Sequence, residues 1–408
     1  MDYNCLREQI TRDLTELCVT IGDRHPGSEQ NQRAVSYTFG RMAATIADTV
    51  MIPLKCLDWE YGNITLKVGG EAVGAFVGPY NESFQITAPF KMASTIDELA
   101  NTDAADHILV LHGELCKEQL APKNFVFYNP EHHQQIIALL EEKNPLAIIA
   151  VTGCNPNATR ALCPFPLIED GDFLIPSCYV DEAAGDRIKA QLGDEIFLSM
   201  ESRRIPSQAH NIIGTVKGKT SERIVFCAHI DTKKDTPGAI DNAGGICLLL
   251  ALADQLRDYA GKYSIELLVI NGEDYYSYPG GMRYLEDNRD RLGEILMVVN
   301  SDGAGARGSR TSFCHFHASE EIQQILNSTF RDQNKYLPVD PWYSGDHMTL
   351  AMNGVPAVAL TTEAIQEILT TVAHTDQDTI DGVDTNILAG VALSLRELID
   401  RLNLLTGS

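Results

Sequence analysis

The chain has 408 residues, of which 44% are hydrophobic, and its formal net charge is -24. This length exceeds that of most single hydrophobic cores, so it predicts two domains or one domain with a large insertion. The negative charge argues against nucleic acids and anionic membrane surfaces as partners, because like charges repel. No apolar run approaches the roughly 18 residues that a membrane-spanning helix requires, which predicts no membrane segment.

The N-terminal segment and the cysteines both indicate where in the cell the protein is located. Residues 1–18 contain acidic side chains near the start and follow an amphipathic helical pattern. A secretory signal would instead show a basic start and an unbroken apolar segment. The ten cysteines are scattered and form no CxxC pair, which is typical of reduced thiols. These observations together predict a cytoplasmic protein.

The first part of the chain changes character near residue 60. Residues 1–50 predict two helices around a turn, and residues 51–70 alternate as a strand does. One helix is predicted over 130–145 from its apolar spacing, and the segment 152–176 is rich in turn formers. Short apolar runs that suit buried strands lie at 107–113, 124–130 and 146–153.

From about residue 205 the pattern becomes an alternation of strands and helices. Apolar strands are predicted at 223–231, 264–274, 295–303 and 355–363. Helices are predicted between and after them, at 244–260, 279–292, 319–333 and 386–405. Near-continuous apolar strands that alternate with helices predict an α/β fold, with a mainly parallel sheet covered by helices on both faces.

Residues of the types that bind metals follow the predicted strands of this C-terminal part. They are His229, Asp241, Asp274, Asp302 and His374. Ligands of an open α/β sheet bind at the carboxyl ends of its strands, so these side chains are expected at one rim. Carboxylates that are crowded together repel one another unless cations are bound. The set therefore predicts two divalent metal ions, with zinc favoured and cobalt or manganese as alternatives.

Glu273 directly precedes one of these ligands, Asp274. Adjacent residues at the end of a strand point in different directions, so Glu273 can approach a water molecule without binding a metal. A carboxylate in that place can act as a general base. Each motif alone also has a structural explanation, such as a helix cap around Asp241. Their joint occurrence favours a metallohydrolase.

The motifs at these positions resemble peptidase family M28, of the aminopeptidase Y and leucyl aminopeptidase type. The matching segments are AHIDT, PGAIDNAGG, NGED, NSDG and AHTDQDTID, in family order, and the N-terminal R-x-x-G-S segment at 24–28 is similar too. The resemblance implies a zinc-peptidase fold in a discontinuous domain, residues 1–60 and 205–408. Residues 61–204 resemble an inserted protease-associated (PA) domain, smaller and α+β or β-rich.

The resemblance also implies a role for each ligand candidate. His229 and Asp302 would hold one metal ion. Asp274 and His374 would hold the other, and Asp241 would bridge the two. The family commonly has a Glu-Glu pair where this chain has Glu273-Asp274, so the second ligand here is one methylene shorter.

Two further acids receive catalytic roles from the same resemblance. Glu273 would take the proton of the attacking water and later pass it to the leaving amine. Asp231 would orient the ring of His229 from behind. The peptide bond between Asp241 and Asn242 is expected to be cis, as in relatives.

The predicted reaction is removal of N-terminal residues from peptide substrates. A carboxypeptidase or dipeptidase on the same metal centre is an alternative, for which Arg283, Arg307 and Arg310 are candidate carboxylate partners. Glutaminyl-cyclase-like acyl transfer and a non-catalytic scaffold are further alternatives, which the full ligand set disfavours. Tyr275, Tyr276 and Tyr278 could line a substrate pocket. The sequence leaves a homo-oligomer open.

Overall fold

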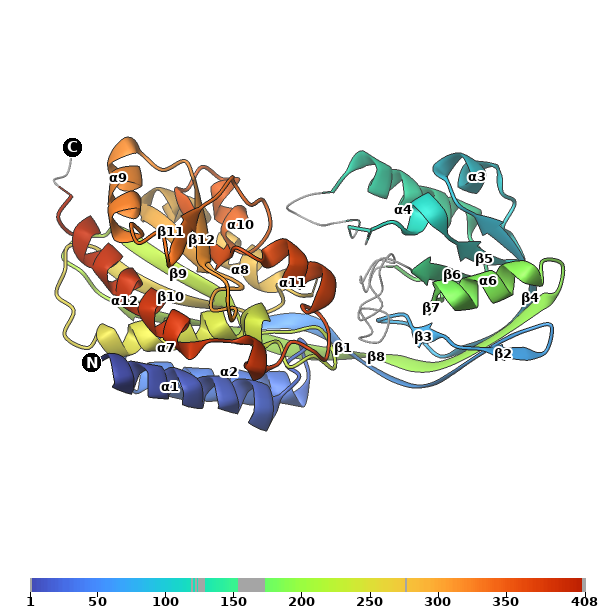
Figure 1. Cartoon of the computed structure of the whole chain (residues 1–408), viewed down its shortest axis with the longest axis horizontal. Helices are drawn as coiled ribbons and strands as arrows, with labels where there is room; N and C mark the ends of the chain where they lie inside the picture. Colours follow the sequence, from blue (N-terminus) through green and yellow to red (C-terminus); the bar gives the residue numbers. More distant parts are fainter. Residues whose placement is uncertain are drawn as a thin grey trace. The chain divides into compact units, whose positions relative to one another are not determined.

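The computed structural model describes residues 2–118, 120–121, 123, 129–152, 173–275 and 277–405. The chain forms two compact units, drawn in Figure 1. Unit 1 comprises Met1–Cys56, Gln208–Asp274 and Tyr278–Ser408, and unit 2 comprises Leu57–Ser207 and Tyr275–Ser277. Two long strands, β1 (Thr49–Val68) and β8 (Glu195–Val216), belong in part to each unit.

Unit 1 is built on a sheet in the order β13-β12-β14-β11-β9-β10-β8. The four strands β14, β11, β9 and β10 are parallel, whereas β8 and β12 add to them in the antiparallel direction. The predicted α/β fold with a mainly parallel sheet is therefore confirmed. The bounds are β9 (Arg223–His229), β10 (Ser264–Ile270), β11 (Ile295–Ser301), β12 (Thr311–Phe316), β13 (Tyr336–Pro338) and β14 (Ala357–Thr362).

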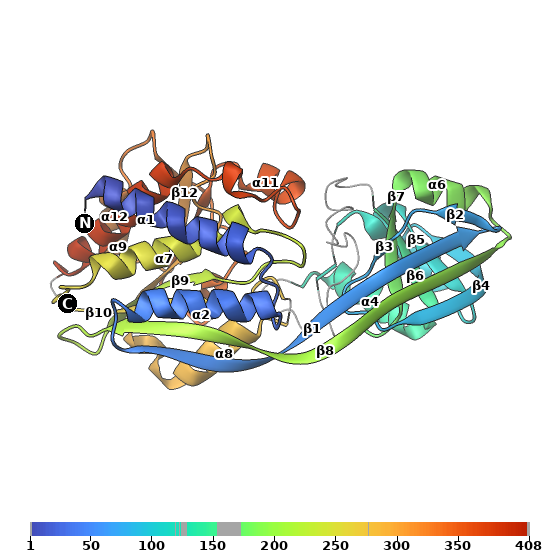
Figure 2. The same ribbon diagram turned by 90° about the horizontal axis from the view of Figure 1, so that it is seen from below.

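Helices cover both faces of this sheet (Figure 2). On one face α7 (Gly244–Gln255) contacts β9 and is itself covered by α1 (Tyr3–Thr15), α2 (Glu29–Ala43) and α12 (Thr385–Leu402). Every residue of α7 from Gly244 to Asp254 is buried, which explains why this helix is apolar on all sides. The other face carries α8 (Pro279–Asn288) and α10 (His347–Ala351). Two further helices are α9 (Glu320–Thr329) and α11 (Ile365–Thr371).

Unit 2 has its own sheet, in the order β8-β4-β5-β6-β7-β3, and its own apolar cores. The strands β4 to β7 are parallel to one another. Their bounds, with β2 and β3, are β2 (Glu71–Val73), β3 (Phe76–Val77), β4 (Phe84–Ala93), β5 (Ile108–Leu111), β6 (Ala147–Thr152) and β7 (Ser177–Asp181). The helices are α3 (Ile96–Asn101), α4 (Glu131–Lys143) and α6 (Glu182–Ala190).

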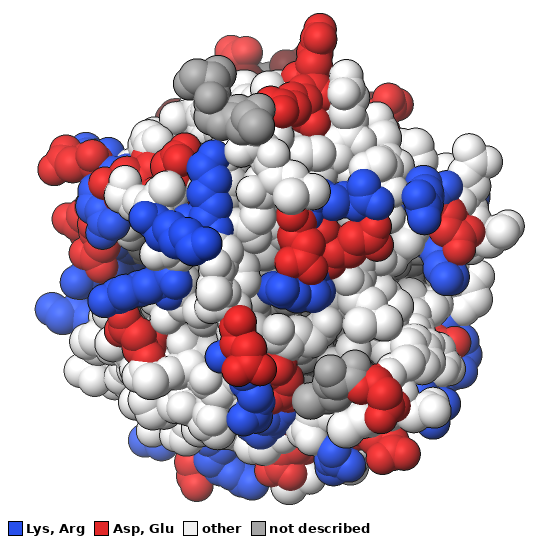
Figure 3. All heavy atoms as spheres, turned by 90° about the vertical axis from the view of Figure 1, so that its left-hand side faces the viewer, with Lys and Arg blue, Asp and Glu red and all other residues white. Residues whose placement is uncertain are grey.

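Two segments singled out in the sequence fall largely outside the described residues. They are the predicted strand at 124–130 and the turn-rich stretch at 152–176. Within the described part of the chain, the eight cysteines form no disulfide, and no helix is long and apolar enough to cross a membrane. Figure 3 shows basic and acidic side chains interspersed on one face of the molecule, although the net charge is -24.

Candidate metal centre

The five predicted ligands come together at the carboxyl ends of the parallel strands of unit 1. His229 is the last residue of β9, and Asp302 directly follows β11. Asp274 lies in the segment after β10, and Asp241 lies in the turn that leads into α7. His374 lies between α11 and α12, with its backbone in the left-handed region (φ 61°). Separate connections after the strands therefore deliver each side chain to one edge of the sheet.

Asp241 stands at the centre of this group. Its Oδ1 is 3.0 Å from Nε2 of His229, and its Oδ2 is 3.1 Å from Nε2 of His374. Asp274 Oδ1 lies 3.0 Å from the same nitrogen of His374, and Asp302 Oδ1 lies 3.6 Å from that of His229. Each imidazole thus faces one oxygen of the shared Asp241 carboxylate and one further carboxylate, which is Asp302 for His229 and Asp274 for His374. The peptide bond that follows Asp241 is cis.

Two buried polar atoms indicate that these residues fit a bound cation. Nε2 of His229 faces carboxylate oxygens without forming a hydrogen bond to them, and Oδ2 of Asp274 has no hydrogen-bond partner within the described part of the chain. The other ring nitrogen of His229, Nδ1, lies 3.2 Å from the carbonyl oxygen of Asp231. A hydrogen on Nδ1 satisfies that contact and leaves the lone pair of Nε2 for a metal. Imidazole and carboxylate ligands of this kind suit zinc and similar divalent ions.

The charges of the group also favour a cation. Burial raises the pKa of Asp302 above its ordinary value. Burial acts on Asp241 in the same direction, but its ion pairs with His229 and His374 outweigh it and hold the pKa well below the ordinary value. Burial acts to lower the pKa of His229, yet the facing carboxylates of Asp241 and Asp302 raise it well above the ordinary value. A divalent ion would replace the proton of the His229 imidazole as the balancing charge.

Asp231 has contacts beyond those expected of it. Its carboxylate was expected to orient the ring of His229, but Oδ1 is 3.8 Å from Nδ1, and the backbone carbonyl makes the closer contact. The carboxylate instead accepts three backbone N–H groups, from Gly272 (2.6 Å), Glu273 (3.1 Å) and Asp274 (2.9 Å). Asp231 therefore fixes the turn that carries Glu273 and Asp274, because a buried carboxylate needs such donors.

Glu273 lies among other acids at the edge of this group. Burial, followed by the like charges of Asp346 and Asp302, raises its pKa well above the ordinary value. Asp346 is buried and accepts a hydrogen bond of 2.8 Å from the hydroxyl of Tyr278. Burial raises the pKa of Asp346 to about 7. A carboxylate with a raised pKa is a stronger base, which suits a group that takes a proton from water.

Asp378 and Lys233 support the site, although neither was singled out in the sequence. Asp378 accepts the backbone N–H groups of Ile240 (2.8 Å) and Asp241 (3.0 Å). Lys233 donates from Nζ to the carbonyl oxygen of Asp274 (2.6 Å). The only signal for Asp378 was its place in the same short segment as His374. These contacts tie the ligand-bearing turns to one another.

The three arginines that were candidate partners for a substrate carboxylate all contact groups of the protein itself. Arg283 pairs with Asp287, Arg310 pairs with Glu363, and Arg307 donates to the backbone oxygens of Asp381 and Val383. All three cations are therefore already engaged.

Two of the three tyrosines suggested for a substrate pocket give no support for that role. Tyr278 is 1% exposed and hydrogen-bonds to Asp346, and Tyr276 lies outside the described residues.

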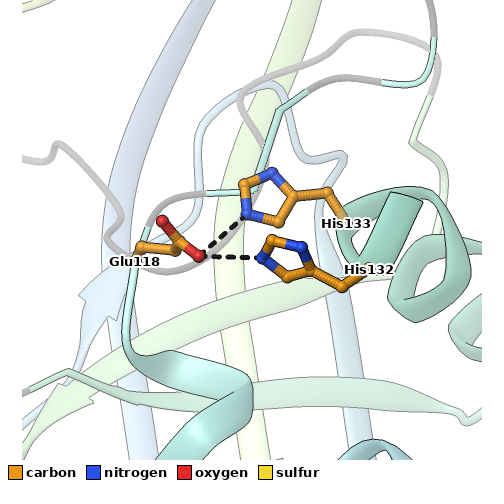
Figure 4. A group of neighbouring side chains, drawn as sticks. All are labelled: Glu118, His132 and His133. Carbon is orange, nitrogen blue, oxygen red and sulfur yellow. Dashed lines mark hydrogen bonds and ion pairs between the residues drawn. The ribbon is translucent and has the colours of Figure 1, made fainter. Parts of the chain in front are cut away.

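A second cluster of ligand-type residues lies in unit 2, where α4 presents His132 and His133 to Glu118 (Figure 4). Both Nε2 atoms face Oε1 of Glu118, at 2.9 Å for His132 and 3.3 Å for His133. Nδ1 of His133 accepts the backbone N–H of Ala121 (3.0 Å). A neutral imidazole carries one hydrogen, so this contact places it on Nε2 and removes the lone pair that a metal needs. We therefore interpret this cluster as a hydrogen bond between His132 and Glu118 with the ring of His133 beside it, and not as a metal site.

A buried group of imidazoles and carboxylates at the carboxyl rim of a mainly parallel sheet defines a metal-dependent hydrolase. Residues 211–399 match Peptidase family M28. Residues 211–399 therefore form a Peptidase family M28 domain, and the protein is a metallopeptidase. The family resemblance of the sequence motifs is confirmed, whereas the resemblance of residues 61–204 to a PA domain stays a prediction.

Related proteins have low sequence identity to this chain. A probable leucine aminopeptidase 2 of Aspergillus oryzae is 20% identical over 370 residues, which cover 83% of this chain and 68% of the relative. A probable leucine aminopeptidase 1 of Trichophyton verrucosum is 24% identical over 208 residues, 43% of this chain and 53% of the relative. The chain thus spans about half the length of this second relative.

Solved structures share the fold. An aminopeptidase from Aneurinibacillus sp. strain AM-1 has a TM-score of 0.74 at 17% identity, over 96% of this chain and 93% of that chain. A zinc aminopeptidase from Bacillus subtilis, BSAP, has a TM-score of 0.75 at 17% identity, over 96% and 95%. At such identities the likeness concerns the fold alone.

Proposed function

We propose that this protein is an aminopeptidase that hydrolyses the N-terminal peptide bond of peptides with two divalent metal ions, preferentially zinc. The observation that carries the proposal is the position of Asp241, whose two oxygens face two different imidazoles, those of His229 and His374. A carboxylate that bridges two ions needs this arrangement. The names of the related aminopeptidases, one of which is a zinc enzyme, support the same reaction.

The roles of the chain's own groups follow from this assignment. His229 and Asp302 would hold one ion, Asp274 and His374 the other, and Asp241 both. Bound ions of this kind lower the pKa of a water molecule and polarise the carbonyl oxygen of a substrate.

The remaining steps belong to residues that do not bind the metals. The carboxylate of Glu273 accepts the proton of the attacking water and then donates it to the nitrogen of the leaving amine. Asp231 holds the backbone of Glu273 in place through its hydrogen bond to the N–H group. The C–O bond forms first and gives a tetrahedral carbon, and the C–N bond breaks afterwards. One proton of the water reaches the leaving nitrogen through Glu273, and the other stays with the new carboxyl group.

The expected substrate has a free α-amine. An α-amine has a pKa of about 7.7–8.0, so a large fraction of it is cationic at neutral pH. The acids Glu273 and Asp346 lie beside the proposed ligands, and the chain carries a net charge of -24. An acidic rim attracts an ammonium group over distances of up to about 8–10 Å at physiological salt. The carboxypeptidase alternative lacks this support, because its candidate arginines are already engaged.

A panel of matched peptides tests this proposal. One peptide would be supplied in three forms, unmodified, N-acetylated and C-amidated, to the zinc-loaded protein, and the released residues identified by mass spectrometry. An aminopeptidase cleaves the unmodified and the C-amidated forms but spares the acetylated form, which has lost its charge. Release of the C-terminal residue, with the acetylated form cut as fast as the free one, would establish a carboxypeptidase instead.

A further inference from the structure

Arg24 is a fully buried cation in unit 1, with 0% of its surface exposed. Its guanidinium group makes its hydrogen bonds to backbone carbonyl oxygens instead of to carboxylates. These oxygens belong to Leu17 (3.3 Å), Gly22 (3.0 Å), Ile230 (2.9 Å), Pro237 (2.5 Å) and Gly238 (2.9 Å). A planar group with five donors can satisfy such a set, and a buried charge requires this degree of compensation.

The carbonyl partners of Arg24 define which part of the chain it holds. Ile230 directly follows His229, and Gly238 precedes Asp241 by three positions. The guanidinium thus binds both ends of the segment that joins these two ligands. A third contact fixes the middle of the segment, since the backbone N–H of Arg24 donates to Oγ1 of Thr232 (2.9 Å).

The segment packs against Arg24 with no spare room. Gly238 has a positive φ of 58°, and a Cβ atom built on it would lie 2.2 Å from Thr232 Cγ2 and 2.5 Å from the carbonyl oxygen of Asp241. The same atom would lie 3.0 Å from Nη2 of Arg24. A displacement of the guanidinium therefore has to move the turn that carries Asp241.

We infer that Arg24 is a positioning residue of the metal centre, which sets the separation between His229 and Asp241 by clamping residues 230–238. The inference rests on the proposed function in that these two residues are taken as metal ligands. Arg24 touches neither ligand's side chain and takes no part in the reaction. Its effect on the centre is transmitted through the backbone carbonyls that it holds.

The substitution Arg24→Lys tests this role, because an ammonium group keeps the charge but cannot reach carbonyls spread over a planar fork. We expect zinc to bind about 10- to 100-fold more weakly, the range for residues that orient ligands, in a titration against a chelating dye. We also expect faster hydrogen exchange of the amides of residues 231–241 in the metal-free protein. This second readout does not depend on catalysis or on metal binding.

Arg41→Lys is the matched control in the same unit. Arg41 bridges the carboxylates of Asp13 (2.9 Å) and Asp254 (3.1 Å), away from the ligand segment. We expect it to lower the melting temperature without changing zinc affinity or the exchange of residues 231–241. Equal effects of the two variants on zinc and on exchange would overturn the inference, as would wild-type zinc binding by Arg24→Lys.

A milder variant decides the matter if Arg24→Lys does not fold. Thr232→Val removes only the acceptor for the Arg24 backbone N–H and keeps the shape of the side chain. Faster exchange over 231–241 supports the clamp, and unchanged exchange overturns it. A wild-type protein that binds zinc but cleaves no peptide would instead refute the proposed function, and the variants would still decide the role of Arg24.

Discussion

Two regions of this protein direct histidines at carboxylates, and they differ in what lies behind the rings. In unit 1, Nδ1 of His229 faces the carbonyl oxygen of Asp231, so Nε2 keeps its lone pair. In unit 2, Nδ1 of His133 accepts the N–H group of Ala121, so Nε2 carries the hydrogen, and it lies 3.3 Å from Oε1 of Glu118. The backbone group behind an imidazole therefore separates a metal ligand from a hydrogen-bond donor.

The two regions also differ in how much of their side chains is exposed to water. The side chain of His229 is 0% exposed and that of Asp241 is 14% exposed. The side chains of His132 and Glu118 are 51% and 59% exposed, so water screens their interaction, although the side chain of His133 is only 5% exposed. Charges crowded in the buried region need a bound cation, whereas those in the exposed region do not.

The largest effect that distinguishes the regions is expected from Glu273→Gln. Glutamine keeps the shape of the side chain but cannot accept a proton from water. We expect kcat to fall by about 10²- to 10⁴-fold, the range for a general base, while metal content stays unchanged. Steady-state kinetics with a metal count on the same sample measure both quantities. The matched substitution Glu118→Gln should leave kcat at the wild-type value, and near-normal turnover of Glu273→Gln would remove this residue from the reaction.

Prediction from the sequence was reliable where a pattern depends on local composition. The strands β9, β10, β11 and β14 were predicted because their apolar runs are long and are followed by polar residues. The 22-residue strand β8 was not predicted as one strand, since Arg203, Arg204 and Pro206 break its apolar pattern. Its pairing with β4 and β10 supplies the hydrogen bonds that hold it, and this pairing leaves no local signal.

The site shows the same division between local and distant information. The types and order of the ligand candidates were readable because each lies beside a strand end. The contacts of Arg24 could not be predicted from the sequence. Every residue has a carbonyl group, so nothing in the sequence marks the acceptors, and several of them are distant in sequence from Arg24. The hydrogen bonds of the Asp231 carboxylate could not be predicted for a related reason, because the three N–H groups that it accepts lie on another strand connection.

A smaller effect is expected from Asp231→Asn. The amide side chain cannot accept three N–H groups, and each buried group left unsatisfied costs about 1–3 kcal/mol in free energy of unfolding. Urea denaturation measures this loss, and metal affinity should fall with it because the turn carrying Asp274 is released. The control Asp181→Ala removes a carboxylate that accepts the N–H of Ala184 in unit 2 (2.7 Å). It should lower stability by about 0.5–2 kcal/mol without weakening metal binding.

The smallest effect is expected from Glu118→Gln, the counterpart of these changes in unit 2. The hydrogen bond from His132 lowers the pKa of Glu118 below its ordinary value. A lowered pKa means that the ionised form stabilises the fold above the ordinary value of about 4.3, and that this contribution disappears as the pH falls further. For an exposed pair we expect a loss of at most about 1 kcal/mol at pH 7, and a smaller difference from wild type at pH 3. A loss of bound metal from this variant would show that we have misread the cluster.

The most direct test of the account is a count of metal ions per chain after equilibrium dialysis against dilute zinc. We predict two ions in the wild-type protein and two in the double variant His132→Ala/His133→Ala, since the cluster in unit 2 binds none. We predict that Asp241→Ala loses both ions together, because it removes the ligand that they share. Full occupancy in Asp241→Ala, or a loss of zinc from the double variant, would contradict the assignment of the metal centre to unit 1.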